Sequence, residues 1–443
     1  MQWEDLLKPY RLGCSKDDIN EDMDRTNFQR DFYRIIFSTP FRRLNGKTQV
    51  FPFPESDIIH TRLTHSLETA SAGRSLGTIA GNKLNERGRN IQGCDLGAIV
   101  SAASLAHDIG NPPLGHSGEK AISEFFLSER GREIIADLCD EQKADFTTFE
   151  GNSMGFHLLT YSNPILTNVT GGLGLTYPVV ASFMKYPRPS LVQNEKKIVC
   201  EKKPGIFQFD LEIYHEISHE LGIPLKEDGD RWYRHPLAFL TEAADDICYA
   251  IMDLEDGYKH GLLDYQTTAS FLTEICIAQT GETNIDALKN IIDERNRIGF
   301  LRAKAINSLI HQSAKVFLEN EEAILEGKLD QPLSEIIESA HIREEILNVS
   351  FRKIYSYKPV LQVEAAGFWV LPGLLDTFLY AIKEPGKASS KKIQQLIPND
   401  YRADFDKDPY EAIIQITAYI AGMTDSFAID TYRNLRGIQL PNH

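Results

Sequence analysis

The densest group of potentially reactive side chains lies in the string LAHDIGNPPLGHSGE, residues 105–119. His107 and Asp108 follow a small, apolar run that is typical of a buried helix. Burying both polar groups is costly unless each finds a partner, and a shared divalent cation is the simplest partner. The Pro-Pro pair then forces a turn, and a new helix is expected to start near His116. There His116 and Glu119, three residues apart, would share a face, so that the carboxylate orients and charge-stabilises the imidazole.

Two further clusters carry similar groups. The string HTRLTHSLE starts a helix and contains His65, with Arg62 one turn earlier. Arg62 either binds phosphate or pairs with an acid. In EAADDICYAIMDLEDG, Asp245, Tyr249 and Asp253 are four residues apart and therefore stack on one face of a helix. Because small and apolar residues surround this row, we expect it to be closely packed rather than solvated.

Together the clusters supply two imidazoles and two carboxylates, from His65, His107, Asp108 and Asp245. Such a mixed nitrogen and oxygen site suits Mn²⁺, Fe²⁺, Co²⁺, Ni²⁺ or Zn²⁺, and it suits Mg²⁺ where phosphate oxygens complete the shell. Ligands from three separate helices, with coordination positions left open, point to a catalytic rather than a structural metal site.

Helical periodicity dominates the elements that must position these groups. The expected helices are Leu67–Leu84, Leu96–His107, Ala121–Leu138, Leu237–Tyr258, Ala303–Leu325, Leu333–Val349 and Tyr410–Ala421. Strand candidates are few and short: Thr48–Phe53, Ile198–Cys200 and Ile206–Phe209. The stretch Gly171–Gly205 is rich in Gly, Pro and Lys and is expected to be a loop-rich insertion. The pattern predicts a mainly α fold with a small β element.

Composition sets the wider limits. The 443 residues include 47 Lys and Arg against 63 Asp and Glu, which gives a formal net charge of −16. No 18-residue uncharged apolar run is present and the start is acidic at Glu4 and Asp5, so we expect neither a membrane span nor a secretory signal. Six scattered cysteines without C-x-x-C spacing indicate reduced thiols in the cytoplasm. The acidic balance disfavours broad duplex-DNA binding.

Longer strings make the sequence recognisable. They are FRRLNGKTQVFP (41–52), TRLTHSLE (61–68), HDIGNPPLGHSGE (107–119), FEGN (149–152), EAADDICY (242–249) and MTDSFA (423–428). With them the chain resembles the deoxynucleoside triphosphate triphosphohydrolases, the dGTPase branch in particular, of the HD-domain metal-dependent phosphohydrolases. The resemblance spans nearly the whole chain. It implies one large domain, with a helical HD core at about 25–265 and a C-terminal helical part at about 266–443.

The resemblance also implies roles for individual residues. His65, His107, Asp108 and Asp245 match the family's metal ligands, with Mn²⁺ or Mg²⁺ favoured, while His116 matches the catalytic histidine and Glu119 the carboxylate paired with it. Gln49 and Asp253 match groups that hold the sugar 3′-hydroxyl, Tyr249 matches the ring against the deoxyribose, and Arg62 matches a phosphate contact. Glu364 matches a base-reading carboxylate and Tyr355 a base-stacking ring. The sequence departs from the pattern at His60, where relatives often carry Arg.

The implied activity is hydrolysis of a deoxynucleoside triphosphate, with dGTP favoured, to the nucleoside and tripolyphosphate. Basic side chains such as Arg62, Lys185 and Arg352 would offset the charge of the triphosphate. The resemblance further implies a homo-oligomer, commonly a hexamer, and in some relatives a nucleotide effector or binding of single-stranded DNA.

Two alternatives stay open at this point. An HD phosphohydrolase that cleaves a monoester or a cyclic diester would need only the metal set and would leave the sugar-contacting residues unexplained. A non-catalytic nucleotide sensor or single-strand binder would keep the fold, and the lysines within 185–203 together with Lys391 and Lys392 are consistent with binding. The presence of both His116 and Glu119 argues against a protein that has lost catalysis.

Overall fold

The computed structural model describes residues 1–16, 24–51, 60–164, 166–192, 202–226, 229, 231–280 and 286–439. In chain order the α-helices of these ranges are α1 (Trp3–Leu6), α2 (Asn27–Ile36), α3 (Thr39–Arg43), α4 (Arg62–Glu86), α5 (Gly93–Ala106), α6 (Gly115–Leu127), α7 (Glu129–Ile134), α8 (Asp140–Thr147), α9 (Gly151–Thr160), α10 (Tyr177–Phe183), α11 (Leu211–Glu220), α12 (Pro236–Lys259), α13 (Tyr265–Thr280), α14 (Glu294–Glu319), α15 (Glu321–Leu325), α16 (Ala340–Ser350), α17 (Lys358–Lys383), α18 (Ala388–Gln395), α19 (Pro409–Ala421) and α20 (Asp425–Leu435). This confirms a mainly α fold.

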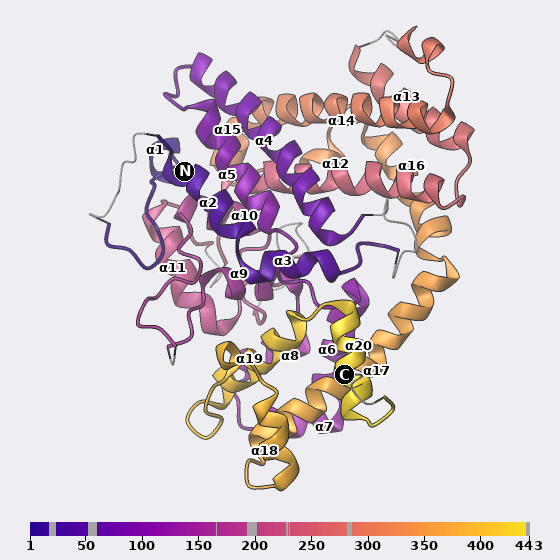
Figure 1. Ribbon diagram of the computed structural model, residues 1–443. Helices are drawn as coiled ribbons and strands as arrows, with labels where there is room; N and C mark the ends of the chain where they lie inside the picture. Colours follow the sequence, from indigo (N-terminus) through magenta and orange to yellow (C-terminus); the bar gives the residue numbers. More distant parts are fainter. Residues whose placement is uncertain are drawn as a thin grey trace.

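The larger hydrophobic core is built around the pair α4 and α5 (Figure 1). The two helices approach closely because small residues face one another along the contact. At Gly77 a Cβ atom would lie only 2.5 Å from the carbonyl oxygen of Leu96, so any side chain there would push the helices apart. Helices α2, α10, α12 and α14 pack around this pair. The close contact fixes the carboxyl end of α5 relative to the amino end of α4.

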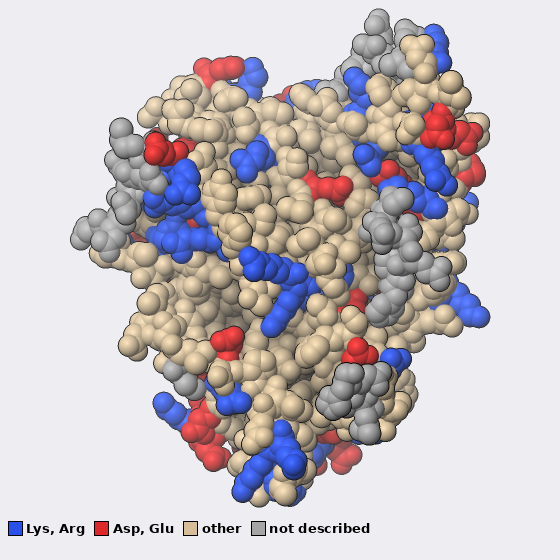
Figure 2. All heavy atoms as spheres, in the orientation of Figure 1, with Lys and Arg blue, Asp and Glu red and all other residues tan. Residues whose placement is uncertain are grey.

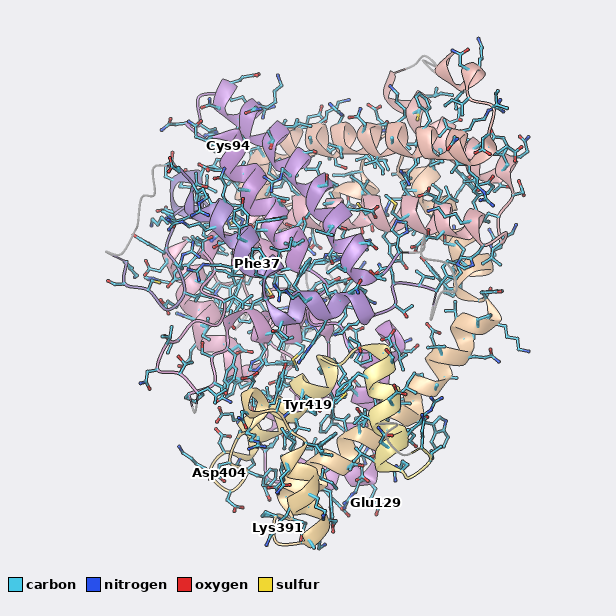
Figure 3. All side chains as sticks on the ribbon, in the orientation of Figure 1. Phe37, Cys94, Glu129, Lys391, Asp404 and Tyr419 are labelled. Carbon is cyan, nitrogen blue, oxygen red and sulfur yellow. The ribbon has the colours of Figure 1, made fainter. Side chains whose placement is uncertain are left out.

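A second core lies beside the first and draws on distant parts of the chain. It combines α6, α7 and α8 with α17, α19 and α20. In Figure 1 this group forms the lower part of the molecule, and α17 runs along one side from the upper group to the lower one. Tyr419 of α19 lies inside the lower group against Phe378, whereas Lys391 and Asp404 lie on its outer rim (Figure 3).

β structure in the described ranges is limited to isolated bridges. Thr48 bridges Thr61, and Ile206 bridges Pro189. The prediction of a strand at Ile206–Phe209 is wrong, because the chain turns into a single 3₁₀ turn at Gln208–Asp210. The candidate Ile198–Cys200 and the end of Thr48–Phe53 lie outside the described residues.

Several helix boundaries differ from those that the hydrophobic periodicity predicts. The run Ala121–Leu138 is broken at Ser128, where the hydroxyl accepts the Gly131 N–H and starts α7 as a new helix. Of Leu333–Val349 only the second half is α-helical, as α16. The stretch Gly171–Gly205 is not all loop, because it contains α10, whose seven residues are all buried.

The long helix α17 is apolar enough, by length and composition, to cross a membrane, and α19 with α20 would pass the same test as a bent pair. Half of the most apolar stretch of α17 is buried inside the fold, against α6, α19 and α20. A helix that packs in a protein core passes the same test, so length and composition alone are weak evidence for a membrane span. The five cysteines that the structure describes are all free thiols, and Cys200 lies outside those residues.

Candidate active site

A cavity of about 750 Å³ opens where α4, α5, α6, α10, α12 and α17 meet. Ten of the twelve predicted site residues line it: Gln49, Arg62, His65, His107, Asp108, Glu119, Asp245, Tyr249, Tyr355 and Glu364. Asp253 lies behind Tyr355, and the side chain of His116 lies outside the described structure. Groups from residue 49 to residue 364 of the sequence are thus brought to one place.

The floor of the cavity carries three side chains with metal-ligating atoms. His65 of α4, His107 at the end of α5 and Asp245 of α12 each offer one ligand atom, and these atoms lie within 4.8 Å of one another. The Oδ1 atom of Asp245 is 3.1 Å from Nε2 of His65 and 3.4 Å from Nε2 of His107. The donor set fits a divalent transition metal.

Hydrogen bonding prepares His107 for this position. Its Nδ1 lies 2.7 Å from the carbonyl oxygen of Ser104, so Nδ1 carries the proton and donates it to that oxygen. The Nε2 lone pair is then directed at the Asp245 side, which is the arrangement that ligating histidines commonly show.

The charges of the cluster stabilise one another. Burial alone would raise the pKa of Asp245, but the two neighbouring imidazoles hold it well below its usual range. Burial opposes protonation of His107, yet the charges of Asp108 and Asp245 outweigh it and raise the pKa of His107 to about 9. The site therefore favours an ionised Asp245 next to a positive charge, which either a proton or a bound cation on Nε2 of His107 would supply.

Asp108, the fourth predicted ligand, sits at the edge of the cluster. Its Oδ1 is 3.5 Å from Nε2 of His107 and accepts a hydrogen bond from the Asn111 amide. Its Oδ2 accepts a 2.7 Å bond from Nη1 of Arg62, which lowers the pKa of Asp108 against the effect of burial. Arg62 thus pairs with an acid, which is one of the two roles predicted for it, and it also lines the cavity.

The neighbouring carboxylate of Asp246 is used differently. Its Oδ2 accepts a hydrogen bond from the Ser334 hydroxyl and forms an ion pair with Nη2 of Arg343 at 3.1 Å. Because successive positions on a helix point about 100° apart, only Asp245 of this pair faces the two histidines.

The turn after His107 leads directly into α6, which starts at Gly115, close to the expected position. Leu114 adopts a left-handed conformation with φ of 66°, which is unusual for a residue with a branched side chain. One turn into the helix, Glu119 is buried and its Oε1 accepts the N–H of Gly151 at 2.8 Å. The FEGN string thereby contacts the first turns of α6. The pairing of His116 with Glu119 stays a prediction.

Two tyrosines, Tyr249 and Tyr355, also line the cavity. The Tyr355 hydroxyl donates a 2.5 Å hydrogen bond to Oδ2 of Asp253, and the rings of Tyr249 and Tyr355 lie 6.1 Å apart at an angle of 33°. Burial raises the pKa of Asp253 to about 7. In the described structure the buried Oε1 of Gln49 has no hydrogen-bond partner, which is the state of an acceptor directed toward a ligand.

His60 also has a defined place. Its Nδ1 lies 2.8 Å from Oδ2 of Asp256, and its Nε2 lies 3.3 Å from Oε1 of Glu68. Although burial opposes protonation, these two carboxylates raise the pKa of His60 to about 10. His60 thus ties the start of α4 to the end of α12.

Residues 339–434 match a family model described as the phosphohydrolase-associated domain. Over the whole length, the chain is similar to proteins named deoxyguanosinetriphosphate triphosphohydrolase-like protein. The relative from Synechocystis sp. is 40% identical over 99% of this chain and all of its own length. Those from Pseudomonas aeruginosa and Listeria innocua are 38% and 32% identical over 100% and 99% of this chain, and likewise over their full length. The chain belongs to the deoxyguanosinetriphosphate triphosphohydrolase-like family. It is therefore a hydrolase, of the HD superfamily that the sequence indicated.

The cavity lining also includes residues that the sequence analysis did not single out. Lys203 lines the cavity and lies 2.8 Å from a carboxylate oxygen of Glu150. Lys185, which had been suggested, also lines it and is 3.3 Å from Glu242. Arg352 does not belong to the lining, and its Nε donates to a backbone carbonyl. The lysine group around 196–203 was the signal available for Lys203, but only the fold shows which lysine reaches the cavity.

Proposed function

We propose that this protein hydrolyses a deoxynucleoside triphosphate, preferably dGTP, to the deoxynucleoside and tripolyphosphate, by attack of water at the α-phosphorus. The observation that carries the proposal is a three-ligand cluster in a cavity with two further kinds of lining residue. Tyr249, Tyr355 and Gln49 suit a deoxyribose, and Lys185 and Lys203 suit a phosphate chain. The name that the related proteins carry supports the same substrate class.

A divalent metal, Mn²⁺ or Mg²⁺ in the first place and Fe²⁺, Co²⁺, Ni²⁺ or Zn²⁺ as further candidates, supplies Lewis acidity to the α-phosphate and a more acidic water. His65, His107 and Asp245 would hold it, and Asp108 would join them from the Arg62 side. Arg62 is then placed to keep the Asp108 carboxylate ionised and oriented.

The triphosphate carries a charge that the protein must offset. Lys185 and Lys203 line the cavity from the segment after α10, and Arg62 lines it from α4. Each has a carboxylate close by, so the cations are held in place before substrate binds. Held cations stabilise a transition state without the cost of reorganisation.

The proton transfer is assigned to His116 with Glu119 behind it. Glu119 is fixed by the Gly151 N–H, so it can hold an imidazole in one orientation. On the sugar side, the Tyr249 ring would exclude a 2′-hydroxyl, and Gln49 and Asp253 would hold the 3′-hydroxyl. Glu364 lines the same cavity from α17 and is proposed to contact the base.

Further features are proposed from the resemblance: a cytoplasmic location, a homo-oligomer such as a hexamer, a nucleotide effector and weak binding of single-stranded DNA. On one face of the molecule, basic and acidic side chains are interspersed rather than separated (Figure 2). That surface therefore carries no single field of negative charge that would repel a polyanion.

The test is to incubate the purified protein with dGTP and Mn²⁺ or Mg²⁺ in heavy-oxygen water. Tripolyphosphate that carries the heavy oxygen, together with unlabelled deoxyguanosine, is expected from attack at phosphorus. Pyrophosphate with dGMP, orthophosphate with dGDP, or no product would overturn the proposal. A panel of the four deoxynucleotides and GTP then measures base and sugar preference.

An HD phosphomonoesterase or cyclic phosphodiesterase is the competing enzyme. It would use the same three ligands, and it would turn over a nucleoside monophosphate or a cyclic dinucleotide in the same assay. Lys185 and Lys203 favour the triphosphohydrolase, because a monophosphate or a cyclic diester carries less charge for the cavity to offset than a triphosphate does.

A further inference from the structure

The MTDSFA string, which the proposed chemistry leaves without a role, contacts two residues that line the cavity, Thr48 and Leu114. Its Asp425 is the first residue of α20 and only 2% exposed. The two carboxylate oxygens accept hydrogen bonds from different segments. Oδ2 accepts the N–H of Thr48 at 2.8 Å, and Oδ1 accepts the N–H of Leu114 at 3.0 Å.

Each of these N–H groups belongs to a part of the site. Leu114 is the left-handed residue that turns the chain into α6, two positions before His116. The Asp425 bond satisfies its N–H and so helps to hold a conformation that a leucine seldom adopts. A substitution of Asp425 is therefore expected to change the backbone conformation at Leu114 and with it the orientation of the first turn of α6.

Thr48 precedes Gln49, whose buried side-chain oxygen has no partner within the described structure. The backbone around it is tied down from two sides, because Thr48 also bridges Thr61 at the start of α4. One carboxylate thus connects the residue proposed to hold the sugar with the turn proposed to carry out the chemistry.

A second tie runs parallel to the first. The buried ammonium group of Lys47 donates to the carbonyl oxygens of Asn111 at 2.5 Å and Ala421 at 2.7 Å. The segment before Lys47 also packs closely against the start of α20, since a Cβ atom on Gly46 would lie 2.6 Å from the Thr424 side chain. The corner between α19 and α20 is therefore packed against both site segments.

We propose that Asp425 is a positioning residue, which sets the relative placement of Gln49 and the catalytic turn from within the phosphohydrolase-associated region. The proposal rests on the proposed function for its effect on turnover. Its structural part, the hold on Thr48 and Leu114, is independent of the reaction.

The experiment compares the full-length wild type with Asp425→Asn and Asp425→Ala. Asn keeps one acceptor oxygen and turns an N–H₂ group toward one of the two donors, whereas Ala removes both acceptors. Asp408→Asn is the matched control, because Asp408 also accepts a backbone N–H, that of Glu411 at the start of α19, but lies away from the cavity. Amide hydrogen exchange is measured over 44–51 and 110–118, along with turnover of dGTP and of its 2′,3′-dideoxy analogue.

We expect faster exchange in both segments for the Asp425 variants only. We also expect a loss of roughly tenfold to hundredfold in kcat/KM for dGTP, graded from Asn to Ala. Since Gln49 would be displaced, the preference for dGTP over the dideoxy analogue should fall with it. Metal content should stay at the wild-type level, because no ligand is touched.

Unchanged exchange in both segments would overturn the proposal, and so would an equal loss for both substrates with the preference intact, since that is the signature of a merely destabilised fold. If the Ala variant does not fold, the Asn variant decides. If the wild type releases no tripolyphosphate, the proposed function fails instead, and hydrogen exchange alone decides whether Asp425 holds the two segments.

Discussion

At the level of single residues, the site depends on which of two adjacent aspartates faces the histidines. Asp245 lies between His65 and His107, while Asp246 is bonded to Ser334 and Arg343 on the other side of α12. The two carboxylates are chemically identical, so their difference in role comes only from their direction on the helix.

This difference predicts opposite results for two neighbouring variants. Asp245→Ala should lose bound metal and dGTP turnover together, and His107→Ala should do the same. Asp246→Ala should keep its metal. Its free energy of unfolding should fall by roughly 1–3 kcal/mol, because the Arg343 charge loses its partner. Metal analysis and urea unfolding of the purified variants check this. Full metal stoichiometry in both Asp245→Ala and His107→Ala would show that the ligand assignment is wrong.

Tyr249 offers a second test at this scale. Its ring borders the cavity beside Tyr355. If it excludes a 2′-hydroxyl, Tyr249→Ala should lower the ratio of kcat/KM for dGTP over GTP by roughly tenfold or more, since a steric barrier is removed. Tyr249→Phe keeps the ring and should keep the ratio. An unchanged ratio in the Ala variant would place the sugar elsewhere.

At the level of elements, the position of the turn that follows His107 is fixed by a second helix, α9, which packs directly against it. Gly110 meets the start of α9, where a Cβ atom would lie 2.1 Å from both Gly151 O and Gly155 N. These are backbone atoms that cannot move aside. The same helix start supplies the N–H that binds Glu119.

We therefore expect Gly110→Ala to destabilise the protein by about 2 kcal/mol or more and to reduce turnover, because overpacking against backbone forces α9 away. Gly299→Ala in α14 is the control. Within the described structure, no atom outside the neighbouring backbone of its own helix lies within 4 Å of its would-be Cβ, so the substitution should raise stability by about 0.5–1 kcal/mol through helix propensity. Urea unfolding of both variants measures the difference. Equal stability of Gly110→Ala and the wild type would contradict this account of the packing.

At the level of the whole molecule, buried polar pairs join the two cores. His157 of α9 donates through Nδ1 to Asp210, and its Nε2 accepts from the side chain of Gln415 in α19. Asp145 of α8 accepts the N–H of Gln208 at 2.8 Å and the hydroxyl of Tyr410. The C-terminal helices are thus held to the core by polar groups as well as by apolar contacts.

Burial raises the pKa of Asp145 to about 7. The folded chain therefore holds this proton at pH values where the unfolded chain has released it, and stability from this group falls as the pH rises from about 4 through 7. Asp145→Asn, which cannot ionise, should become more stable relative to the wild type between pH 5 and pH 8, by on the order of a few kcal/mol. Urea unfolding at both pH values tests this. A stability difference that does not change with pH would rule out a protonated Asp145.

The net charge of −16 also has its explanation at this scale. Asp108, Glu119 and Asp253 are buried in or beside the cavity, and each interacts with a defined partner there. Part of the acidic excess thus consists of site groups rather than surface charge. Such a balance is compatible with a small triphosphate that a metal and basic side chains neutralise.

The sequence by itself determined the helical class and the family, and it supplied the candidate site residues, because helix periodicity and short motifs are local properties. The four-residue spacing also placed Asp245 on one helix face with Tyr249 and Asp253. The tertiary structure alone decided the break at Ser128, the burial of α10 and which lysine reaches the cavity. It alone joined Asp425 to Thr48 and Leu114, which are 377 and 311 positions away. Contacts of that separation depend on how the two cores pack, and no local pattern records them.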